Sequence, residues 1–566
     1  MFPPHCYAPG ESVTQNDIQT ASSPKPLKTN VAIATFLIAL PLLFVRLGHY
    51  ALWDDEAGTA LTAIGVWRTG DTSAVIDHNV VAYESGKDLV NLRERLMPPL
   101  PAYLAAPFVG LFGRNAIAAR LPFVLCGAAC VGLMVWWAVR SKLGSAGLLF
   151  FAAALLTNVS FFLFCRQCRY YAVAMLTSVA LAWLYVHYDG RRWKIVLFSF
   201  ISLCLFASNY LNWAAFYMCL AIDYLIWGRK NPVAADLASR KRVLRFSDWL
   251  IILLPQLIIG GIIFSIWNPL RVLNAVEPYP VANRLLYLWW TVRDITTCEF
   301  GAPLLVLLAV ALSFTRAKAY PWLLRSSVCL IVYIIAMSFL VQRPPSLRGV
   351  AAVRYLIPII PLFVGIAVMS LNALHARWKW AAMILAAVAF SSNLLNGGPL
   401  LTTGLRSTIV DYVIEIVHPP TDPYTATVGW IRQNVHERES VWVVPDYATY
   451  PLMFHAPAPT YAWQLTWPPA KPEFTNLPAI HFIGRVPPQY IVGFGPATKL
   501  AADSIVSWNR PDLHYSQIGT IDCFWKDMHR PELFWRTFRP VTNYDKTSEA
   551  IYLFRLDAPS AGPARR

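Results

Sequence analysis

The chain has 566 residues, of which 56% are hydrophobic and only 14% are charged. Soluble globular domains carry roughly a quarter charged residues, so this composition excludes an ordinary soluble protein and predicts an integral membrane protein. The formal net charge of +16 would also fit a nucleic-acid-binding protein. Its basic residues lie in short loops between apolar segments, however, and we expect no nucleic acid partner.

The chain begins with a polar segment, residues 1–30, which is rich in Ser, Thr, Pro and Asn. This composition predicts a disordered cytoplasmic tail. The first apolar segment, 31–51, is followed by no small-residue cleavage pattern before Trp53. It is therefore predicted to be a retained membrane anchor and not a cleaved signal sequence.

A membrane domain is predicted over residues 31–394. About eleven apolar runs in this range are long enough to cross a hydrocarbon core of about 30 Å. Basic residues cluster in every second connection, as the positive-inside rule expects of cytoplasmic loops. These residues are Arg140, Lys142, Arg191, Arg192, Lys194, Arg229, Lys230, Arg240, Lys241, Arg242, Arg245, Arg316, Lys318, Arg325, Arg377 and Lys379. The first loop, 51–117, is thus predicted to be extracytoplasmic.

An acidic cluster, Asp54, Asp55 and Glu56, directly follows the first apolar segment. Residues 53–63 are predicted to form a short helix at the membrane surface, and its first turn holds the three carboxylates, where the helix dipole favours negative charge. These acids alone fit two interpretations. They cap a surface helix, or one of them is a general base, with a metal-binding neighbour, that faces a lipid-borne substrate.

Five further segments supply the context of this cluster. They are MPPLPAYL at 97–104, LFG at 111–113, AARLP at 118–122, FCRQCRYYAV at 164–173 and VRYLIPIIP at 353–361. In this order and spacing they resemble the membrane glycosyltransferases of the GT-C superfamily, specifically the family 39 type that includes protein O-mannosyltransferases and the aminoarabinose transferase of lipid A. The Asp-Glu pair of that family falls on Asp55 and Glu56.

The resemblance implies a polytopic α-helical GT-C domain, surrounded by the lipids of a bacterial inner membrane, that transfers a sugar with inversion. The donor would be a polyprenyl monophosphate sugar, and the acceptor a lipid, glycan or protein on the extracytoplasmic side. Asp55 would take the proton of the acceptor hydroxyl, and Glu56 would orient the acceptor, the base or a cation. Asp54 is an extra acid that competes for these roles. No cofactor is otherwise expected, although Asp55 and Glu56 could hold a divalent cation.

A lipid phosphate needs hydrogen-bond donors, and the guanidinium fork of arginine matches phosphate oxygens. The candidates for binding the phosphate and the sugar, all at predicted outer membrane ends, are Arg166, Arg169, Tyr170, Arg348, Arg354 and Tyr355. Arg169 and Arg354 rank first, because each lies in a family-like segment and precedes a tyrosine. The alternative is that these arginines only extend to the membrane surface.

Residues 395–566 are predicted to form an extracytoplasmic α/β domain, because the apolar runs stop there. The predicted elements are helices over 425–434 and 448–454 and strands over 440–444, 489–493 and 551–554. The domain carries no nucleophile elbow, P-loop or metal-ligand spacing. It fits a lid, an acceptor-binding surface or a structural cap.

Two other functions fit a polytopic chain. One is a transporter or flippase for a lipid-linked or surface-polysaccharide precursor, and the other is a noncatalytic assembly scaffold. Charged residues inside the predicted spans are few, and Arg46 and Asp223 lie near span ends. This distribution counts against an ion-coupled transporter, which usually needs ionisable groups near the midplane.

Overall fold

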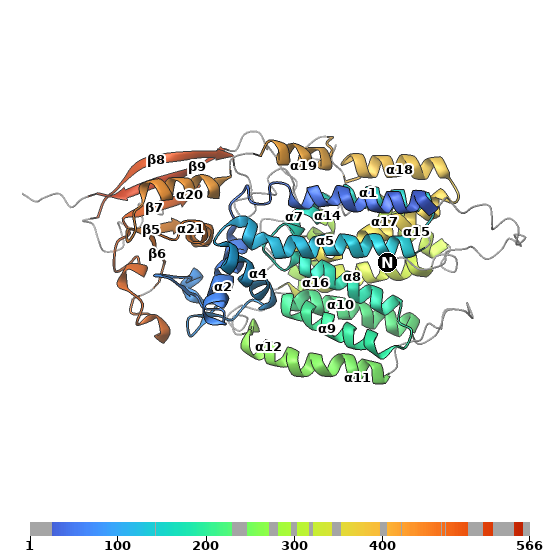
Figure 1. The fold of residues 1–566 in the computed structure, drawn as a ribbon, viewed down its shortest axis with the longest axis horizontal. Helices are drawn as coiled ribbons and strands as arrows, with labels where there is room; N and C mark the ends of the chain where they lie inside the picture. The colour runs from blue at the N-terminus through green and yellow to red at the C-terminus, as the bar shows by residue number, and fades with distance from the viewer. Residues whose placement is uncertain are drawn as a thin grey trace, which may run out of the picture.

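The computed structural model joins a bundle of long helices to a mixed β-sheet, and helices α2 and α4 lie between them (Figure 1). It describes residues 25–141, 143–228, 246–270, 281–295, 303–315, 321–341, 353–396, 405–419, 422–465, 467–469, 471–495, 513–524 and 548–557. Helix α1 (Lys25–Phe44) begins within the predicted tail, so residues 25–30 are helical and not disordered. The rest of that tail lies outside the described residues.

Five helical stretches in the described residues are long and apolar enough to cross a membrane. They are Leu27–Phe44, Ala116–Arg140, Phe246–Ile266, Pro321–Leu340 and Arg354–His375. A bent pair of helices, Ser145–Leu156 and Val159–Cys165, makes a sixth span if it is counted as one. The chain is therefore an integral membrane protein, and the finer count of about eleven spans stays a prediction.

The helices of the bundle come from residues 25–44 and 116–396. They are α1, α5 (Ala116–Arg140), α6 (Ser145–Leu156), α7 (Val159–Cys165), α8 (Tyr171–Val186), α9 (Arg192–Ser208), α10 (Tyr210–Asp223), η1 (Tyr224–Gly228), α11 (Phe246–Pro255), η2 (Gln256–Gly260), α12 (Gly261–Ile266), α14 (Val281–Ile295), α15 (Pro303–Thr315), α16 (Pro321–Leu340), η4 (Val353–Ile359), α17 (Ile360–His375), α18 (Lys379–Ser391) and η5 (Leu394–Asn396). Proline lacks an N–H and crowds the preceding turn, which explains why α11 passes into the π-helix η2 at Pro255.

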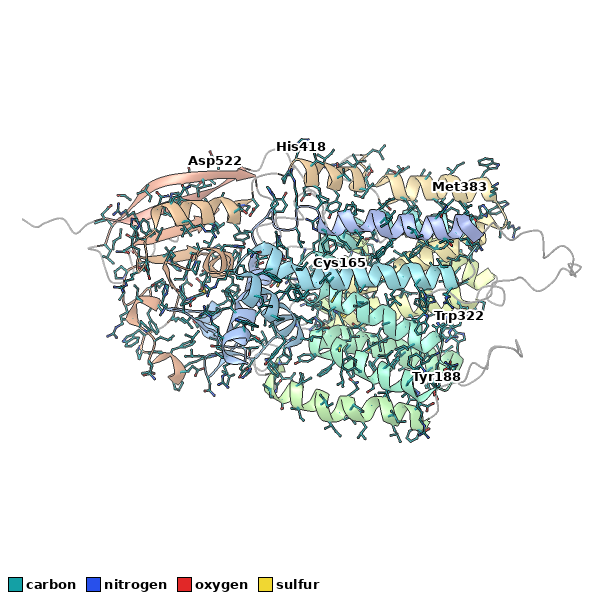
Figure 2. All side chains as sticks on the ribbon, in the orientation of Figure 1. Cys165, Tyr188, Trp322, Met383, His418 and Asp522 are labelled. Atoms are coloured by element: carbon teal, nitrogen blue, oxygen red, sulfur yellow. The ribbon has the colours of Figure 1, made fainter. Side chains whose placement is uncertain are left out.

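The two ends of the bundle differ in chemistry. Figure 2 places Tyr188 and Trp322 at the end remote from the sheet, and Arg191 and Arg325 lie close to them in the sequence. The acidic first loop and the sheet lie at the opposite end. The predicted orientation, with the basic end in the cytoplasm, rests on this asymmetry.

The first loop folds into a compact layer over the bundle. It contains α2 (Asp54–Thr69), the hairpin of β1 (Val75–Ile76) and β2 (Asn79–Val80), α3 (Tyr83–Gly86), the hairpin of β3 (Leu89–Val90) and β4 (Arg93–Glu94), and α4 (Leu100–Phe112). Helix α2 starts within the predicted segment 53–63 and continues to Thr69, where Gly70 ends it with a left-handed φ of 75°.

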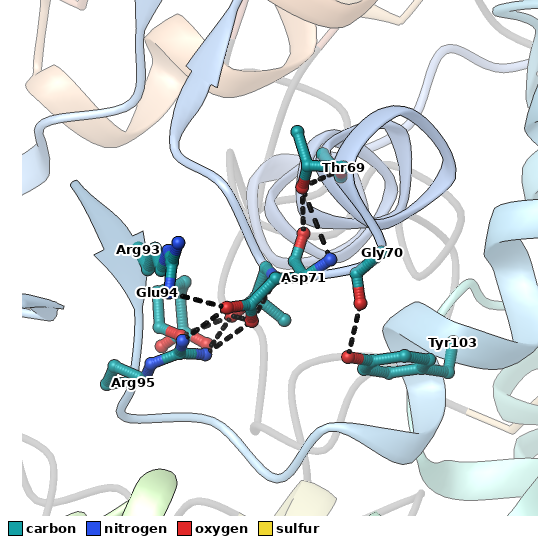
Figure 3. Close-up of polar contacts among 9 residues, drawn as sticks. Thr69, Gly70, Asp71, Arg93, Glu94, Arg95 and Tyr103 are labelled. Atoms are coloured by element: carbon teal, nitrogen blue, oxygen red, sulfur yellow. Dashed lines mark hydrogen bonds and ion pairs between the residues drawn. The ribbon is translucent and has the colours of Figure 1, made fainter. Parts of the chain in front are cut away.

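Asp71, which follows α2, links the end of this helix to the β3–β4 hairpin (Figure 3). Its carboxylate accepts two hydrogen bonds from Arg95, at 2.8 and 2.6 Å, and Arg93 lies 3.0 Å away. The hydrogen bonds from Arg95 lower the pKa of Asp71 to about 2. The Arg95 guanidinium also lies 5.1 Å from the ring centroid of Trp267, so the same cluster reaches the end of α12.

The C-terminal domain is built on a five-stranded sheet with the order β6-β5-β7-β9-β8. Its elements are α20 (Pro423–Asn434), β5 (Ser440–Val444), η7 (Asp446–Ala448), α21 (Thr449–His455), β6 (Thr460–Ala462), η8 (Pro472–Phe474), η9 (Ala479–His481), β7 (Tyr490–Phe494), β8 (Tyr515–Phe524) and β9 (Ser548–Leu556). Strands β6, β5 and β7 run parallel, and β9 pairs antiparallel with β7 and β8. Each of the five elements predicted here is present, whereas β6 and β8 were not predicted.

Buried polar contacts hold the C-terminal domain against the first loop. Asn79 accepts a hydrogen bond from the Tyr461 backbone N–H (2.8 Å) and donates to the Pro459 carbonyl (2.9 Å). The Trp463 indole donates to the Val80 carbonyl (2.9 Å), and the Lys471 ammonium donates to the Leu89 carbonyl (2.8 Å). Segments nearly four hundred residues apart thus share one hydrogen-bonded interface.

A second set of contacts ties the domain to the residues just before α2. The Leu52 N–H donates to Nε2 of His455 (3.0 Å), and the Ala51 N–H donates to the Thr425 hydroxyl (2.9 Å). Burial, together with the charges of Arg120 and Arg432, lowers the pKa of His455 to about 3. The imidazole is therefore neutral at physiological pH and keeps the lone pair that accepts the bond from Leu52.

The Asn79→Ala variant tests the interface between the loop and the domain. It would leave the Tyr461 N–H without its partner, which costs about 1–3 kcal/mol for a buried group, whereas the Pro459 carbonyl would keep its contact with Nε2 of His78 (3.1 Å). We expect a lower thermal unfolding temperature of the purified protein and faster proteolysis between the domains. The Asn434→Ala variant is the control, because Asn434 is exposed and bonds within its own helix. Equal stability of the two variants would contradict the interface role.

Candidate active site at the membrane surface

Asp55 lies between two arginines that come from distant parts of the chain. Its Oδ1 is 3.2 Å from Nη2 of Arg169, and its Oδ2 is 2.9 Å from Nη1 of Arg354. The carboxylate is partly accessible, with 24% of its side chain exposed, so a substrate can reach it. The structure brings together the predicted base, Asp55, and the two arginines that ranked first as predicted phosphate-binding residues.

Arg169 is positioned by the tight connection between α7 and α8. The backbone N–H of Cys168 donates to Oε1 of Glu56 (2.7 Å), which holds this connection against the start of α2. Arg169 then extends along α2, where its Nη1 donates to the Thr59 hydroxyl (3.1 Å), one helical turn beyond Asp55. Both contacts depend on α2 being a helix.

Arg354 comes from the start of η4, the segment that leads into α17. Its guanidinium lies 5.4 Å from the ring centroid of Tyr355. Tyr170 stands at the start of α8, and its hydroxyl is close enough to Arg169 and Arg354 to interact with their charges. Four of the predicted phosphate- and sugar-binding residues are therefore grouped together: Arg169 and Arg354 contact Asp55, and Tyr170 and Tyr355 lie close to these arginines.

Two polar groups of this cluster are enclosed and have no hydrogen-bond partner in the described part of the chain. They are Nε of Arg169 and the hydroxyl of Tyr170. An unsatisfied buried donor costs about 1–3 kcal/mol, and such groups in native proteins call for an explanation. A ligand with anionic oxygens would satisfy both.

Glu56 occupies a different environment from its neighbour. Its side chain is fully buried, and it forms a bidentate pair with Arg120, with Nε–Oε1 and Nη2–Oε2 distances of 2.9 and 2.6 Å. Arg120 uses its remaining N–H groups on three backbone carbonyls. These are the carbonyls of Leu47 (2.9 Å), Tyr50 (3.0 Å) and Ala51 (3.1 Å).

Of the three roles expected for Glu56, this arrangement does not fit contact with the acceptor or a cation, but it fits a role in orienting Asp55. A carboxylate with no exposed surface, bonded to Arg120 and to the Cys168 N–H, cannot contact an acceptor. It acts on the site through the backbone, since it holds the start of α2 and the connection that carries Arg169. Glu56 is therefore a positioning residue.

Asp54 lies close enough to Tyr450 of α21 to act on its charge. Its Oδ1 accepts the Asp55 N–H (2.8 Å), and its charge, with those of Asp88 and Glu94, raises the pKa of Tyr450, for which burial is the larger cause. Burial raises the pKa of Glu94 itself to about 8, and the Asp88 charge adds to this. An acidic wall thus extends from Asp54 toward α21.

The Asp55 and Glu56 pair does not fit a divalent cation. Asp55 is bracketed by two guanidinium groups, and both oxygens of Glu56 are bonded to Arg120. No group of three His, Cys, Asp or Glu side chains within the described ranges is arranged to hold a metal ion. The donors that face Asp55 are cationic, which suits an anion.

The two remaining candidates do not join the cluster. Arg166 donates to the Leu42 and Val45 carbonyls, at 3.3 and 2.8 Å, and to the Tyr412 hydroxyl (2.9 Å). It lies on the side of α1 and not beside Asp55, so its predicted place at the donor phosphate is not supported by these contacts. Arg348 lies outside the described residues.

No protein-family model and no curated protein matches the chain. Among solved structures, ArnT from Cupriavidus metallidurans is similar with a TM-score of 0.52, both bound to undecaprenyl phosphate and in the apo state. The identities are 14% and 15%, over 94% and 93% of this chain and 97% and 98% of the ArnT chain. The Archaeoglobus fulgidus oligosaccharyltransferase gives a TM-score of 0.43 and 11% identity over 77% of this chain and 64% of its own.

The chain has a GT-C fold. The likeness to ArnT extends over nearly the whole of both chains. At such low identity it establishes the fold alone, and the assignment to family 39 stays a prediction.

Sequence reasoning missed Arg120 as a site residue of the GT-C domain, although it stands in the AARLP segment that carried the resemblance. A signal was present: an arginine five residues into an apolar helix needs a buried acidic partner. Thr59, Asp88 and Glu94 were also missed. No local pattern marks them, because their neighbours come from distant segments.

The Glu56→Gln variant tests the buried pair. It would leave the Arg120 charge uncompensated, which is expected to destabilise the protein by about 3–5 kcal/mol. Thermal unfolding of the detergent-purified protein measures the effect, and the exposed Glu437→Gln is the matched control. An unchanged unfolding temperature for Glu56→Gln would show that the pair does not hold the site together.

Glu94 predicts a pH dependence of stability. The folded pKa of about 8 lies above the ordinary value of 4.5, so the unfolded chain loses this proton first as the pH rises. The contribution of Glu94 should be favourable at acid pH and decline from about pH 4.5 to 8. In the Glu94→Gln variant this decline should be absent, as shown by thermal unfolding at several pH values, whereas Glu437→Gln should retain it. Parallel pH profiles for Glu94→Gln and the parent would contradict the raised pKa.

Proposed function

We propose that the chain transfers a sugar from a polyprenyl monophosphate donor to a hydroxyl acceptor, with inversion at the anomeric carbon, at the membrane end that carries the C-terminal domain. The observation that carries the proposal is the Asp55 carboxylate held between Arg169 and Arg354. One carboxylate and two arginines supply a base for the acceptor and a charge-matched site for a leaving phosphate.

The arginines of the cluster match the donor in charge. Arg169 and Arg354 carry two positive charges, and Asp55 neutralises one. A lipid phosphate would occupy the free Nε of Arg169 and the Tyr170 hydroxyl, and it would compete with Asp55 for the guanidinium groups. Donor binding thereby prepares the base, because a carboxylate released from cationic neighbours holds a proton more firmly.

The chemical step is a single displacement. The acceptor oxygen bonds to the anomeric carbon as its proton passes to Asp55, and the bond from that carbon to the phosphate oxygen breaks. The leaving phosphate monoester needs no proton at neutral pH, but its charge must be stabilised, and Arg169 and Arg354 are placed to do this. No metal ion is required by this scheme.

The acceptor would approach from the space beneath the C-terminal domain. Gly58, one turn along α2 from Asp55, faces the Tyr450 ring, since a Cβ built at Gly58 would lie 3.5 Å from it. The acidic wall of Asp54, Asp88 and Glu94 lies on the same side. Carboxyl groups of this kind accept hydrogen bonds from hydroxyl groups, as a glycan, glycolipid or protein acceptor would provide.

The test is transfer activity of the purified protein on a panel of polyprenyl phosphate sugars. Asp55→Asn should lower kcat by about 10²–10⁴-fold, because the base is lost while the side-chain shape is kept. Arg354→Gln should raise the KM for the donor by about tenfold, because a charge-assisted bond to phosphate is lost. Asp77→Asn is the matched control, since Asp77 pairs with Arg68 and Arg114 away from the site.

The same variants separate the transferase from a flippase. If Asp55→Asn retained the function of the wild type, or if no donor of the panel were consumed, the proposed reaction would be wrong. Movement of a labelled lipid-linked sugar across proteoliposomes, without a new glycosidic bond, would favour the flippase. Glycan analysis of a deletion strain by mass spectrometry then names the sugar and the acceptor.

A further inference from the structure

A pocket lies beside Arg120, on the side of α1. It encloses about 450 Å³ of empty space, counting its open mouth. Its lining residues are Arg46, His49, Tyr50, Arg120, Leu163, Arg166, Tyr412, Glu415, Ile416 and Pro419. Asp55, Arg169 and Arg354 are not among them, so the pocket is separate from the candidate active site.

The pocket has a surplus of positive charge. Arg120 is neutralised by Glu56, and Arg46 and Arg166 together outweigh the buried carboxylate of Glu415 by one charge. The Arg46 side chain is exposed and forms no hydrogen bond or ion pair within the described ranges. Its backbone φ of 51° places it in the left-handed region, where a non-glycine residue is uncommon.

His49 does not add to this charge. Burial lowers the pKa of its imidazole, the Arg46 charge lowers it further, and the Asp422 charge acts in the opposite direction. The imidazole is therefore neutral at physiological pH. The anion-binding capacity of the pocket rests on Arg46 and Arg166.

One wall of the pocket is an amphipathic helix, α19 (Thr408–Val417). Its inner face carries Tyr412, which accepts a hydrogen bond from Arg166 (2.9 Å) and donates to the Leu42 carbonyl at the end of α1 (2.8 Å). Its outer face exposes an apolar stripe at helical spacing: Val410, Val413, Ile414 and Val417.

Helix α1 continues this apolar surface. Leu37 and Ile38 are exposed on α1, and the exposed Val45 directly follows this helix and precedes Arg46. In a protein that crosses a membrane, such a surface faces the acyl chains. Arg46 then stands where the span ends, at the level of lipid headgroups.

We propose that this pocket binds the phosphodiester headgroup of an anionic phospholipid, between Arg46 and Arg166, while the acyl chains lie along α1 and α19. The chemistry of the walls supports a lipid and not a soluble anion, because the cationic end and the apolar stripe are adjacent. A net charge of one matches a single phosphodiester. The proposal is independent of the transfer reaction.

Native mass spectrometry of the full-length protein in detergent tests this site. The probes are phosphatidylglycerol and phosphatidylcholine with the same acyl chains. The wild type should retain one phosphatidylglycerol with an affinity about tenfold above that for phosphatidylcholine, and Arg46→Ala should abolish most of this preference. Arg46→Lys should retain part of it. The matched control is Arg192→Ala, since Arg192 is an exposed arginine at the opposite end of the bundle.

Three results would overturn the proposal. The first is equal binding of the two lipids, or an equal loss in Arg46→Ala and Arg192→Ala, which would indicate nonspecific attraction. The second is displacement of phosphatidylglycerol by millimolar inorganic phosphate, which would indicate a soluble-anion site. The third is loss of binding in Arg354→Gln but not in Arg46→Ala, which would place the lipid in the candidate active site.

A photoactivatable phosphatidylglycerol locates the bound molecule directly. Crosslinks should appear on peptides from α1 and α19 in the wild type and should fall several-fold in Arg46→Ala. Crosslinks confined to peptides of other helices would overturn the site. Because none of these measurements uses a sugar donor, their failure and the failure of the transferase proposal are distinguishable.

Discussion

The buried ion pair between Arg120 and Glu56 is the contact on which the geometry of the site depends. Arg120 donates to both oxygens of Glu56 and to the carbonyls of Leu47, Tyr50 and Ala51, so all five of its N–H groups are used. Those carbonyls lie between the end of α1 and the start of α2. One side chain of α5 thereby fixes the connection between α1 and the first loop.

The pair also reaches the third element of the site. Glu56 accepts the Cys168 N–H, and the next residue is Arg169, which contacts Asp55. Removing two charges from water costs several kcal/mol for each ion, and the pair offsets this only because every donor and acceptor is satisfied. A small change at Glu56 should thus move both Asp55 and Arg169.

Asp54, Asp55 and Glu56 have different surroundings because a helix turns by about 100° per residue. Glu56 faces the protein interior, Asp55 faces the accessible cluster of arginines, and Asp54 faces the C-terminal domain. The same rotation explains why one short acidic run can supply a positioning residue, a candidate base and part of an acidic wall. The C-terminal domain completes the enclosure, since Asn79, Trp463 and His455 bind it to the first loop.

The sequence by itself determined the membrane character, the long first loop, the α/β character of the C-terminal region and the ranking of Asp55, Arg169 and Arg354. These follow from composition, local periodicity and motif order, which are properties of neighbouring residues. Only the tertiary structure decided that Glu56 is buried against Arg120, that Arg166 lines a separate pocket and that Asp88 and Glu94 extend the acidic wall. The physical reason is that burial and charge pairing depend on which distant segments of the chain come into contact. The partners of adjacent carboxylates are remote in the sequence and cannot be identified from the neighbouring residues.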